Sequence, residues 1–353
     1  MSKDDKEKVE FNELLSRQEL KDSENTQEEA QQTAEVEAER SLLEGSWPLS
    51  FEGEGGELFG ILIKNLFLNI LTLGIYYPWA KATQLRFYYG SSRIHDSDFQ
   101  FHGTGAEMFI GLLKVFGVLL ILDFIYEGIL AGVFEEGMLF FIGFLYFLIF
   151  MLLMLFASVG VRRYRMSRTS WRGIRFRFLG TFKDTGILIV KGWLLTLLSL
   201  GFYYPYYLNR FQEYWISTTT FGNIAFSYDG EGKEVFRIWL KGMLLTVLTF
   251  GLYSFWLRAN LQRYFWSHTS YAQASIVSRL YGGRWLKESL IFLLIMILTL
   301  GMGRAWAIVR YKKFYLGTLC LEGIIDLAAI KQAEAKLSNA TGEGMADYFD
   351  VEM

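Results

Sequence analysis

The chain has 353 residues, of which 52% are hydrophobic and 17% are aromatic, with 34 glycines and 3 prolines. This composition is typical of a membrane protein rather than of several soluble domains. The formal net charge of −2 combines an acidic stretch, Met1–Arg40, with a mildly basic remainder. A basic body rich in Trp and Tyr favours contact with membrane lipids and argues against nucleic acid as a partner.

The two ends of the chain differ from its body. Residues 1–45 are polar and acidic, and we expect a disordered cytoplasmic tail, because they bury too little apolar surface to offset the entropy of ordering. The alternative is a helix in this tail that recruits a cytoplasmic protein partner. Residues 332–353 are expected to form a flexible C-terminal tail, and no cleavable signal peptide is predicted.

Six apolar stretches follow the acidic tail, and each is long enough to cross about 30 Å of hydrocarbon as a helix. They are Leu58–Trp79, Met108–Leu130, Met138–Val161, Gly186–Tyr207, Val235–Trp256 and Trp285–Ile308. Linkers such as Asp98–Gly103 and Ile174–Gly180 alternate in polarity, which predicts short strands or a hairpin at the interface. The sequence therefore predicts an all-α polytopic membrane protein of about six transmembrane helices, with short β-like interfacial linkers.

An internal repeat of about fifty residues organises these stretches. In four copies an aromatic-x-Gly step is followed by a lysine, thirteen positions after the aromatic residue. The aromatic residues are Phe51, Phe101, Phe178 and Tyr228, and the lysines are Lys64, Lys114, Lys191 and Lys241. A fifth, degraded copy begins near Leu280. The repeat divides a transmembrane domain, residues 46–331, into units near 51–100, 101–177, 178–227, 228–279 and 280–331.

A second block of the repeat begins with a glycine: Gly74, Gly201, Gly251 or Gly301. Five residues after the glycine comes Trp79, Tyr206, Trp256 or Trp306, and twelve after it comes Arg86, Glu213, Arg263 or Lys313. In the second unit the corresponding arginine, Arg163, lies 62 residues after Phe101, whereas Arg86 lies 35 after Phe51. We interpret the 27 additional residues as one extra membrane crossing.

These residues resemble the YjgN-like proteins of bacterial inner membranes, a family of unknown function. The resemblance is carried by Asn69–Lys81, Arg86–Tyr89 and Phe99–Gly105, and it covers roughly residues 46 to 331. It implies a multi-pass protein of the bacterial cytoplasmic membrane, without a known activity or site. Pro78 recurs only as Pro205, which puts a hinge shared by all units in doubt.

Charge in the linkers predicts the orientation. The segment Arg162–Lys183 carries eight Lys and Arg residues and should be cytoplasmic, whereas the acidic loop Gly132–Gly137 should face outward. Strict alternation of the spans would export the acidic tail. We therefore expect cytoplasmic termini and a first unit that enters and returns on the same side, turning at Gly74–Pro78.

Charged residues within the apolar stretches are candidates for function. A charge at membrane depth costs a few kcal/mol unless it snorkels or is paired. The repeat lysines, Lys64, Lys114, Lys191 and Lys241, either snorkel to headgroups or converge on a polar cavity that holds an anionic group. Asp123 is a candidate proton or cation site, with Lys114 as its partner and Glu127 one turn away.

Aromatic and basic residues of the second block are expected to lie at the membrane interface. The predicted anchors are Trp79, Arg86, Arg163, Trp256, Arg263, Trp306 and Lys313. Cation–π contacts with neighbouring aromatic rings would support the basic residues of this group. Phosphate binding at a lipid headgroup is the functional alternative for the same basic residues.

The sequence shows no catalytic pattern. Its histidines are His95, His102 and His268, and Cys320 is the single cysteine, so no HExxH, glycine-rich phosphate loop, nucleophile elbow or cysteine pair is present. We predict that the protein is not an enzyme and has no cofactor or metal site. Cys320 is expected to be a small buried residue.

Two functions from different classes remain open. The first is transport or permeation of a small or anionic solute along a polar pathway lined by the repeat lysines and Asp123. The second is a non-transporting scaffold or lipid-binding protein whose acidic tail recruits a partner. Membrane lipids, a second copy of this chain and a cytoplasmic protein are the partners that the sequence suggests.

Overall fold

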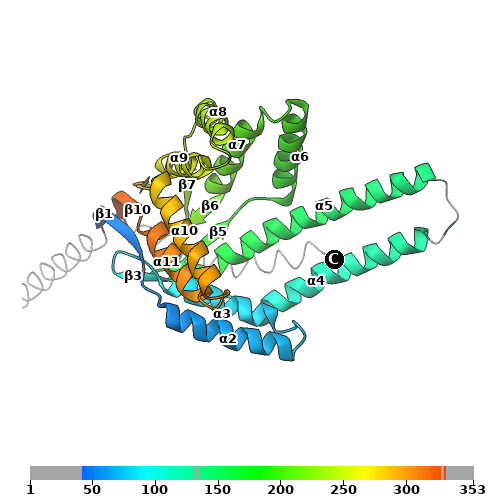
Figure 1. Ribbon diagram of the computed structural model, residues 1–353, viewed down its shortest axis with the longest axis horizontal. Helices are drawn as coiled ribbons and strands as arrows, with labels where there is room; N and C mark the ends of the chain where they lie inside the picture. Colours follow the sequence, from blue (N-terminus) through cyan, green and yellow to red (C-terminus); the bar gives the residue numbers. More distant parts are fainter. Residues whose placement is uncertain (1–41, 131, 133–135, 327–329, 331–353) are drawn as a thin grey trace, which may run out of the picture.

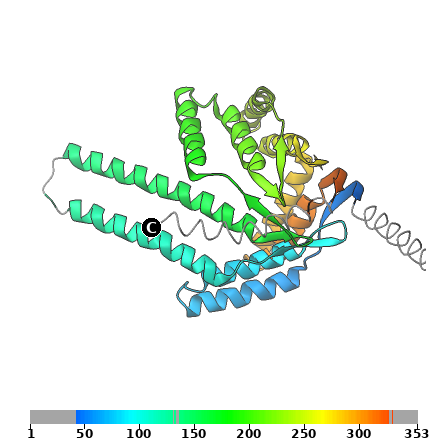
Figure 2. The same ribbon diagram turned by 180° about the vertical axis from the view of Figure 1, so that it is seen from behind.

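The computed structural model describes residues 42–130, 132, 136–326 and 330. Within this part of the chain, a closed barrel of ten antiparallel strands carries five pairs of helices at one end, as Figures 1 and 2 show from two sides. The predicted tails lie outside the described residues, except that residues 42–45 belong to the first strand.

The strands follow the chain order around the barrel, and the first strand closes it by pairing with the last. Their bounds are β1 Leu42–Phe51, β2 Ser92–Ile94, β3 Ser97–Phe101, β4 Thr169–Trp171, β5 Ile174–Phe178, β6 Thr219–Phe221, β7 Ile224–Tyr228, β8 Thr269–Tyr271, β9 Gln273–Ser278 and β10 Leu319–Asp326. Tight turns join β2 to β3 and β4 to β5, where His95 and Arg172 have positive φ angles of 53° and 52°. Such angles match the twist of a short hairpin.

The helices connect the strands at the opposite end of the barrel. Their bounds are α2 Gly55–Leu71, α3 Tyr77–Gly90, α4 Gly105–Leu130, α5 Glu136–Ser167, α6 Phe182–Leu198, α7 Tyr204–Ser217, α8 Gly232–Leu248, α9 Ser254–Ser267, α10 Gly282–Leu298 and α11 Arg304–Leu316. Each unit therefore contains a helical hairpin that leaves the barrel and returns to the next strand.

The bore of the barrel is filled with apolar side chains. Trp171, Phe221, Tyr271 and Ile330 are buried together, and the rings of Phe176 and Phe221 lie 4.7 Å apart. The hydroxyl of Tyr271 donates to the carbonyl of Phe221 at 2.8 Å, so this buried polar group is satisfied. Burial also raises the pKa of Tyr271. The barrel is thus a packed core, as small barrels generally are.

The aromatic-x-Gly step has a steric cause at the junction between barrel and helices. In the second and third units the ring of Phe101 or Phe178 folds back over the glycine two residues later. A Cβ atom at Gly103 would lie 2.5 Å from the Phe101 ring, and one at Gly180 would lie 2.4 Å from the Phe178 ring. Only glycine allows this close approach.

The second glycine of the repeat reverses the chain at the tip of each short hairpin. Leu73 and Gly74 adopt φ angles of 49° and 90°, which end α2. The hydroxyl of Thr72 accepts a hydrogen bond from Tyr76 N at 3.0 Å and so caps the start of α3. The same arrangement recurs in the third, fourth and fifth units at Ser199, Thr249 and Thr299.

Tryptophans join three of the hairpins to the next one, and Tyr206 takes the same place beside Gly232. The ring of Trp79 occupies the space that a side chain at Gly105 would need. The rings of Trp256 and Trp306 occupy the corresponding space beside Gly282 and Gly55. The last contact joins the fifth unit to the first, and α11 packs along α2. The helical hairpins therefore form a closed ring above the barrel.

The predicted all-α fold of about six transmembrane helices is wrong. Among the described residues, two helices, Gly105–Ile129 and Met138–Ser167, are long and apolar enough to cross a membrane. Each of the other four predicted spans is broken by the glycine turn into a helix of 17 residues and the start of another. A helix of this length extends about 25 Å, less than the hydrocarbon thickness.

Two further expectations change in the structure. The strands predicted in the linkers are present, but their closure into a barrel was missed. The extra 27 residues of the second unit do not add a helix, because this unit has two helices like the other units. They lengthen both helices of one hairpin, so that α4 has 26 residues and α5 has 32. Cys320 is buried, as expected, beside the Ser46 hydroxyl.

Candidate functional site: a cationic cluster inside the helical ring

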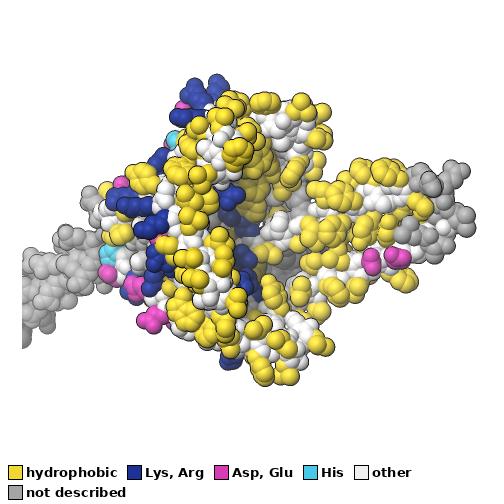
Figure 3. Space-filling model, in the orientation of Figure 1, with side chains coloured by type: hydrophobic (Ala, Val, Ile, Leu, Met, Phe, Trp, Pro, Cys, Tyr) yellow, Lys and Arg dark blue, Asp and Glu magenta, His cyan; other side chains and the backbone are white. Residues whose placement is uncertain are grey.

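The outer surface of the helical hairpins is apolar. Leu73 and Phe250, at the tips of two short hairpins, are 94% and 100% exposed, and Leu200 and Leu300 occupy the same position in two others. Figure 3 shows apolar side chains over the hairpins, whereas most charged side chains gather towards the barrel, apart from acidic side chains on the long hairpin. An exposed apolar surface of this extent marks a membrane contact.

The repeat lysines do not converge. Lys64, Lys114, Lys191 and Lys241 lie on the first helices of their hairpins, and all four are exposed. Lys64 and Lys241 each line a separate pocket, described below. Asp123 is also exposed, and the described residues include no ion pair between it and Lys114.

The basic residues predicted as anchors make contacts between neighbouring units. Arg86 donates to the carbonyl of Gly103 at 3.0 Å, and Arg163 donates to the carbonyl of Gly180 at 3.0 Å. Each arginine thus binds the first residues of the next unit. Arg263 lies over the ring of Tyr281, 5.6 Å from its centre. Interfacial anchoring stays a prediction for these residues and for Lys313, which is exposed on α11.

A cluster of four cations lies on the second helices of three hairpins; its two lysines are partly buried and its two arginines are exposed. It consists of Lys81 on α3, Arg165 on α5, and Arg304 and Lys312 on α11. Burial lowers the pKa of Lys81, and the positive charges of Arg165 and Arg304 lower it further. Burial likewise lowers the pKa of Lys312, with a contribution from Lys81. We call these four residues the cationic cluster.

The cationic cluster has no acidic partner among the described residues. Lys and Arg side chains are visible in the recess between the short hairpins and the long hairpin in Figure 3. Lys81 and Lys312 are partly buried close to other positive charges and without a counter-ion, which is costly. An anion bound among them would reduce this cost, so the arrangement is suited to an anionic group.

Aromatic rings hold Lys312 in place, and the repeat contains a second example of the same contact. The Lys312 ammonium lies 4.4 Å from the centre of the Tyr88 ring. Arg162, at the equivalent position of the second unit, lies 4.3 Å from the centre of the Trp215 ring and donates to the Thr219 hydroxyl. Both cations sit at the junction with the next unit. Such cation–π contacts stabilise a partly buried positive charge.

Sequence reasoning missed the cationic cluster because it followed the repeat lysines. The signal that could have found it is a charge asymmetry between the two helices of each unit. Acidic residues on the second helices are confined to Glu136 and Glu213. Their basic residues are Lys81, Arg86, Arg162, Arg163, Arg165, Arg210, Arg258, Arg263, Arg304, Arg310, Lys312 and Lys313.

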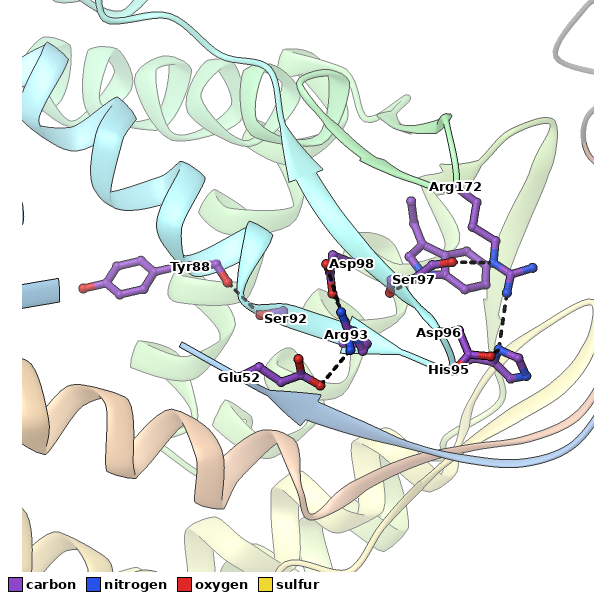
Figure 4. A network of polar contacts seen from close by, with 10 residues as sticks. Glu52, Tyr88, Ser92, Arg93, His95, Asp96, Ser97, Asp98 and Arg172 are labelled. Atoms are coloured by element: carbon purple, nitrogen blue, oxygen red, sulfur yellow. Dashed lines mark hydrogen bonds and ion pairs between the residues drawn. The ribbon is translucent and has the colours of Figure 1, made fainter. Parts of the chain in front are cut away.

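A different polar network runs along one side of the barrel, from the end of α3 to the turn between β2 and β3, as Figure 4 shows. Arg93 donates to Asp98 at 2.7 Å and to Glu52 at 3.0 Å, and Arg172 donates to the Ser97 hydroxyl at 2.9 Å. These contacts join neighbouring hairpins of the barrel and balance the charges locally. The described residues contain no cluster of metal-ligating side chains.

Apolar helical hairpins above a packed barrel, together with two helices long and apolar enough to cross a bilayer, are features of a membrane protein. The chain belongs to the family described as bacterial protein of unknown function (DUF898), whose model matches residues 46–229, 223–277 and 266–348. The resemblance to the YjgN-like family is thereby confirmed.

Two relatives illustrate the similarity. The inner membrane protein YjgN of Salmonella typhimurium strain LT2 is 31% identical over 131 residues, which cover 37% of this chain and 31% of the relative. The protein of the same name from Escherichia coli O157:H7 is 30% identical over 151 residues, 43% of this chain and 35% of the relative. The matches thus span about a third of the relatives' length, and the relatives' names support a bacterial inner-membrane location. No solved structure matches the chain.

Proposed function

We propose that this inner-membrane protein binds the headgroup of an anionic lipid at the cationic cluster. The observation that carries the proposal is the grouping of four cations on the apolar helical hairpins, two of them partly buried, without an acidic partner among the described residues. A lipid phosphate supplies the missing negative charge, and its acyl chains would lie along the apolar hairpins. Catalysis forms no part of the proposal.

The packed barrel favours lipid binding over solute transport as the function. The bore is filled by the side chains of the aromatic core, including Trp171 and Phe221. A solute that followed the axis of the ring would therefore meet a packed core. Self-association and a cytoplasmic partner for the acidic tail stay predictions, and the tail lies outside the described residues apart from 42–45.

The proposal includes a membrane topology. The long hairpin α4–α5 would cross the bilayer twice, whereas the short hairpins would enter the cytoplasmic leaflet and return. The barrel would then lie on the cytoplasmic side together with the ends of β1 and β10. This orientation is supported by the basic segment Arg162–Lys183, which runs from the base of α5 through β4 and β5 to α6.

Cysteine accessibility tests the topology on a Cys320→Ser background. Met138→Cys, near the tip of the long hairpin, should react with an impermeant reagent in intact cells. Asn223→Cys, exposed on the barrel, should react only in inverted vesicles, and Phe250→Cys should react in neither preparation because it lies in lipid. External labelling of Phe250→Cys would mean that the short hairpins cross the membrane.

Thermal stability in lipid nanodiscs tests the binding function. Replacing part of the phosphatidylcholine with phosphatidylglycerol should raise the melting temperature, because a ligand that binds only the folded state stabilises it. Lys81→Gln and Arg304→Gln should each remove most of this increase. Lys313→Gln is the matched control, since Lys313 follows Lys312 on α11 but does not belong to the cluster. An equal increase in all variants would refute the assignment to the cluster.

A further inference from the structure

A pocket of about 590 Å³ lies in the fourth unit, between α8, α9 and the end of β9. Its polar lining includes Lys241 from α8, Asn260 and Arg263 from α9, and Ser278 from β9. The pocket reaches from the barrel to Tyr253 in the turn at the hairpin tip. It does not include any member of the cationic cluster, so it is a separate site.

The polar groups of this pocket are suited to an anion. Asn260 accepts a hydrogen bond from the Arg263 guanidinium at 3.0 Å, and the ring of Tyr281 lies against the same group, so the guanidinium is held in place. No acidic side chain lines the pocket. Two cations, Lys241 and Arg263, therefore face one cavity without a carboxylate.

Ser278 provides an independent indication of a ligand. Its side chain is only 5% exposed, and its hydroxyl has no hydrogen-bond partner among the described residues. A buried hydroxyl without a partner costs about 1–3 kcal/mol. Ser278 lines the pocket, and a rotation of its side chain would bring this hydroxyl to a ligand oxygen bound there.

The first unit contains a pocket at the equivalent place, and the comparison explains why the fourth unit is singled out. Lys64 and Tyr76 line a pocket of about 360 Å³, at the repeat positions of Lys241 and Tyr253. The first-unit pocket contains a carboxylate, Glu57. Its arginine counterpart, Arg86, is not part of the lining and instead binds a backbone carbonyl of the second unit.

We infer that the pocket of the fourth unit binds the phosphate group of a phosphate ester. Lys241 and Arg263 neutralise the phosphate, and the Ser278 hydroxyl donates to one of its oxygens. The ester is either a membrane phospholipid, whose chains continue along the apolar hairpin, or a soluble phosphate compound. The inference does not depend on the lipid site proposed at the cationic cluster, because the two sites share no residue.

The test uses the full-length protein in phosphatidylcholine nanodiscs, titrated with glycerol 3-phosphate in one arm and containing increasing phosphatidylglycerol in the other. Native mass spectrometry counts the bound molecules in both arms. Arg263→Gln should weaken binding about tenfold or more, and Lys241→Gln and Ser278→Ala should weaken it several-fold, in whichever arm contains the natural class of ligand. Lys64→Gln is the control at the equivalent position and should have no effect.

Two measurements distinguish a loss of binding at this pocket from a folding defect and from binding at the cationic cluster. Ser278→Ala should not lower the melting temperature in phosphatidylcholine and should raise it, because it removes a buried hydroxyl that has no protein partner. The Arg263-dependent binding should persist on a Lys81→Gln background, whether or not the cluster binds lipid. Binding that is equal in the wild type, Arg263→Gln and Ser278→Ala in both arms would overturn the inference.

Discussion

In the short hairpin α8–α9, helices of 17 and 14 residues meet at a capped glycine turn, whereas α4 and α5 of the long hairpin have 26 and 32 residues. The bases of both kinds of hairpin are nevertheless built alike. Trp79 packs on Gly105 at the start of α4, as Trp256 packs on Gly282 at the start of α10. The repeat therefore preserves the base and leaves the length of the hairpin free to vary.

The difference in hairpin length shows that the base and the outer part of a hairpin meet different requirements. The base must fit its neighbours closely, since each hairpin helps to close the ring. The outer part of the long hairpin extends beyond the ring, as Figures 1 and 2 show, and Gly111 on α4 has no neighbouring side chain within 4 Å. The base is thus set by protein packing, whereas the lengths of α4 and α5 are sufficient to cross a bilayer.

The largest expected effect comes from filling the space at the base of the long hairpin. Gly105→Leu should destabilise the protein by about 1–3 kcal/mol, because the new side chain would overlap the ring of Trp79. Gly111→Leu, two turns along the same helix, should be neutral or stabilising, since leucine favours helix more than glycine does. Thermal melts in detergent measure both. Equal effects of the two substitutions would contradict the distinction between base and outer part.

A smaller effect is expected from the arginines that bind the next unit. Arg86→Met in a short hairpin and Arg163→Met in the long hairpin should each cost about 1–2 kcal/mol, because each removes one charge-assisted hydrogen bond to a backbone carbonyl. Denaturant or thermal unfolding compares the two variants. If the long hairpin were attached differently, Arg163→Met would have a clearly different effect from Arg86→Met.

The smallest effect concerns the turn at the tip of a short hairpin. Thr249→Val should cost about 1 kcal/mol, because the hydroxyl caps the backbone N–H of Tyr253 at 2.9 Å. Thr246→Val is the control, since the Thr246 hydroxyl bonds only to the carbonyl of Gly242 one turn earlier in its own helix. The melting temperatures of the two variants should differ by a few degrees. A control that is as destabilised as Thr249→Val would argue against the capping role.

Sequence reasoning located the repeat positions but not all of their roles. The spacing of Gly74 and Trp79 was found correctly, and the turn expected at Gly74–Pro78 is present between α2 and α3. The tryptophan was predicted as a membrane anchor, and the structure shows it packed on Gly105 of the next unit. A residue that recurs once per unit can contact either lipid or the neighbouring unit, and spacing alone does not distinguish the two.

The sequence by itself indicated the membrane character, the glycines at fixed intervals and the turn at Gly74–Pro78, because these depend on local hydropathy and local spacing. Only the tertiary structure decided the barrel and the cationic cluster. Strands of three to five residues, such as Ser92–Ile94 and Ser97–Phe101, are stabilised by pairing with neighbours, and so they leave a weak local pattern. Lys81, Arg165 and Arg304 come together only when the ring of hairpins closes, since no local spacing relates residues on three separate helices.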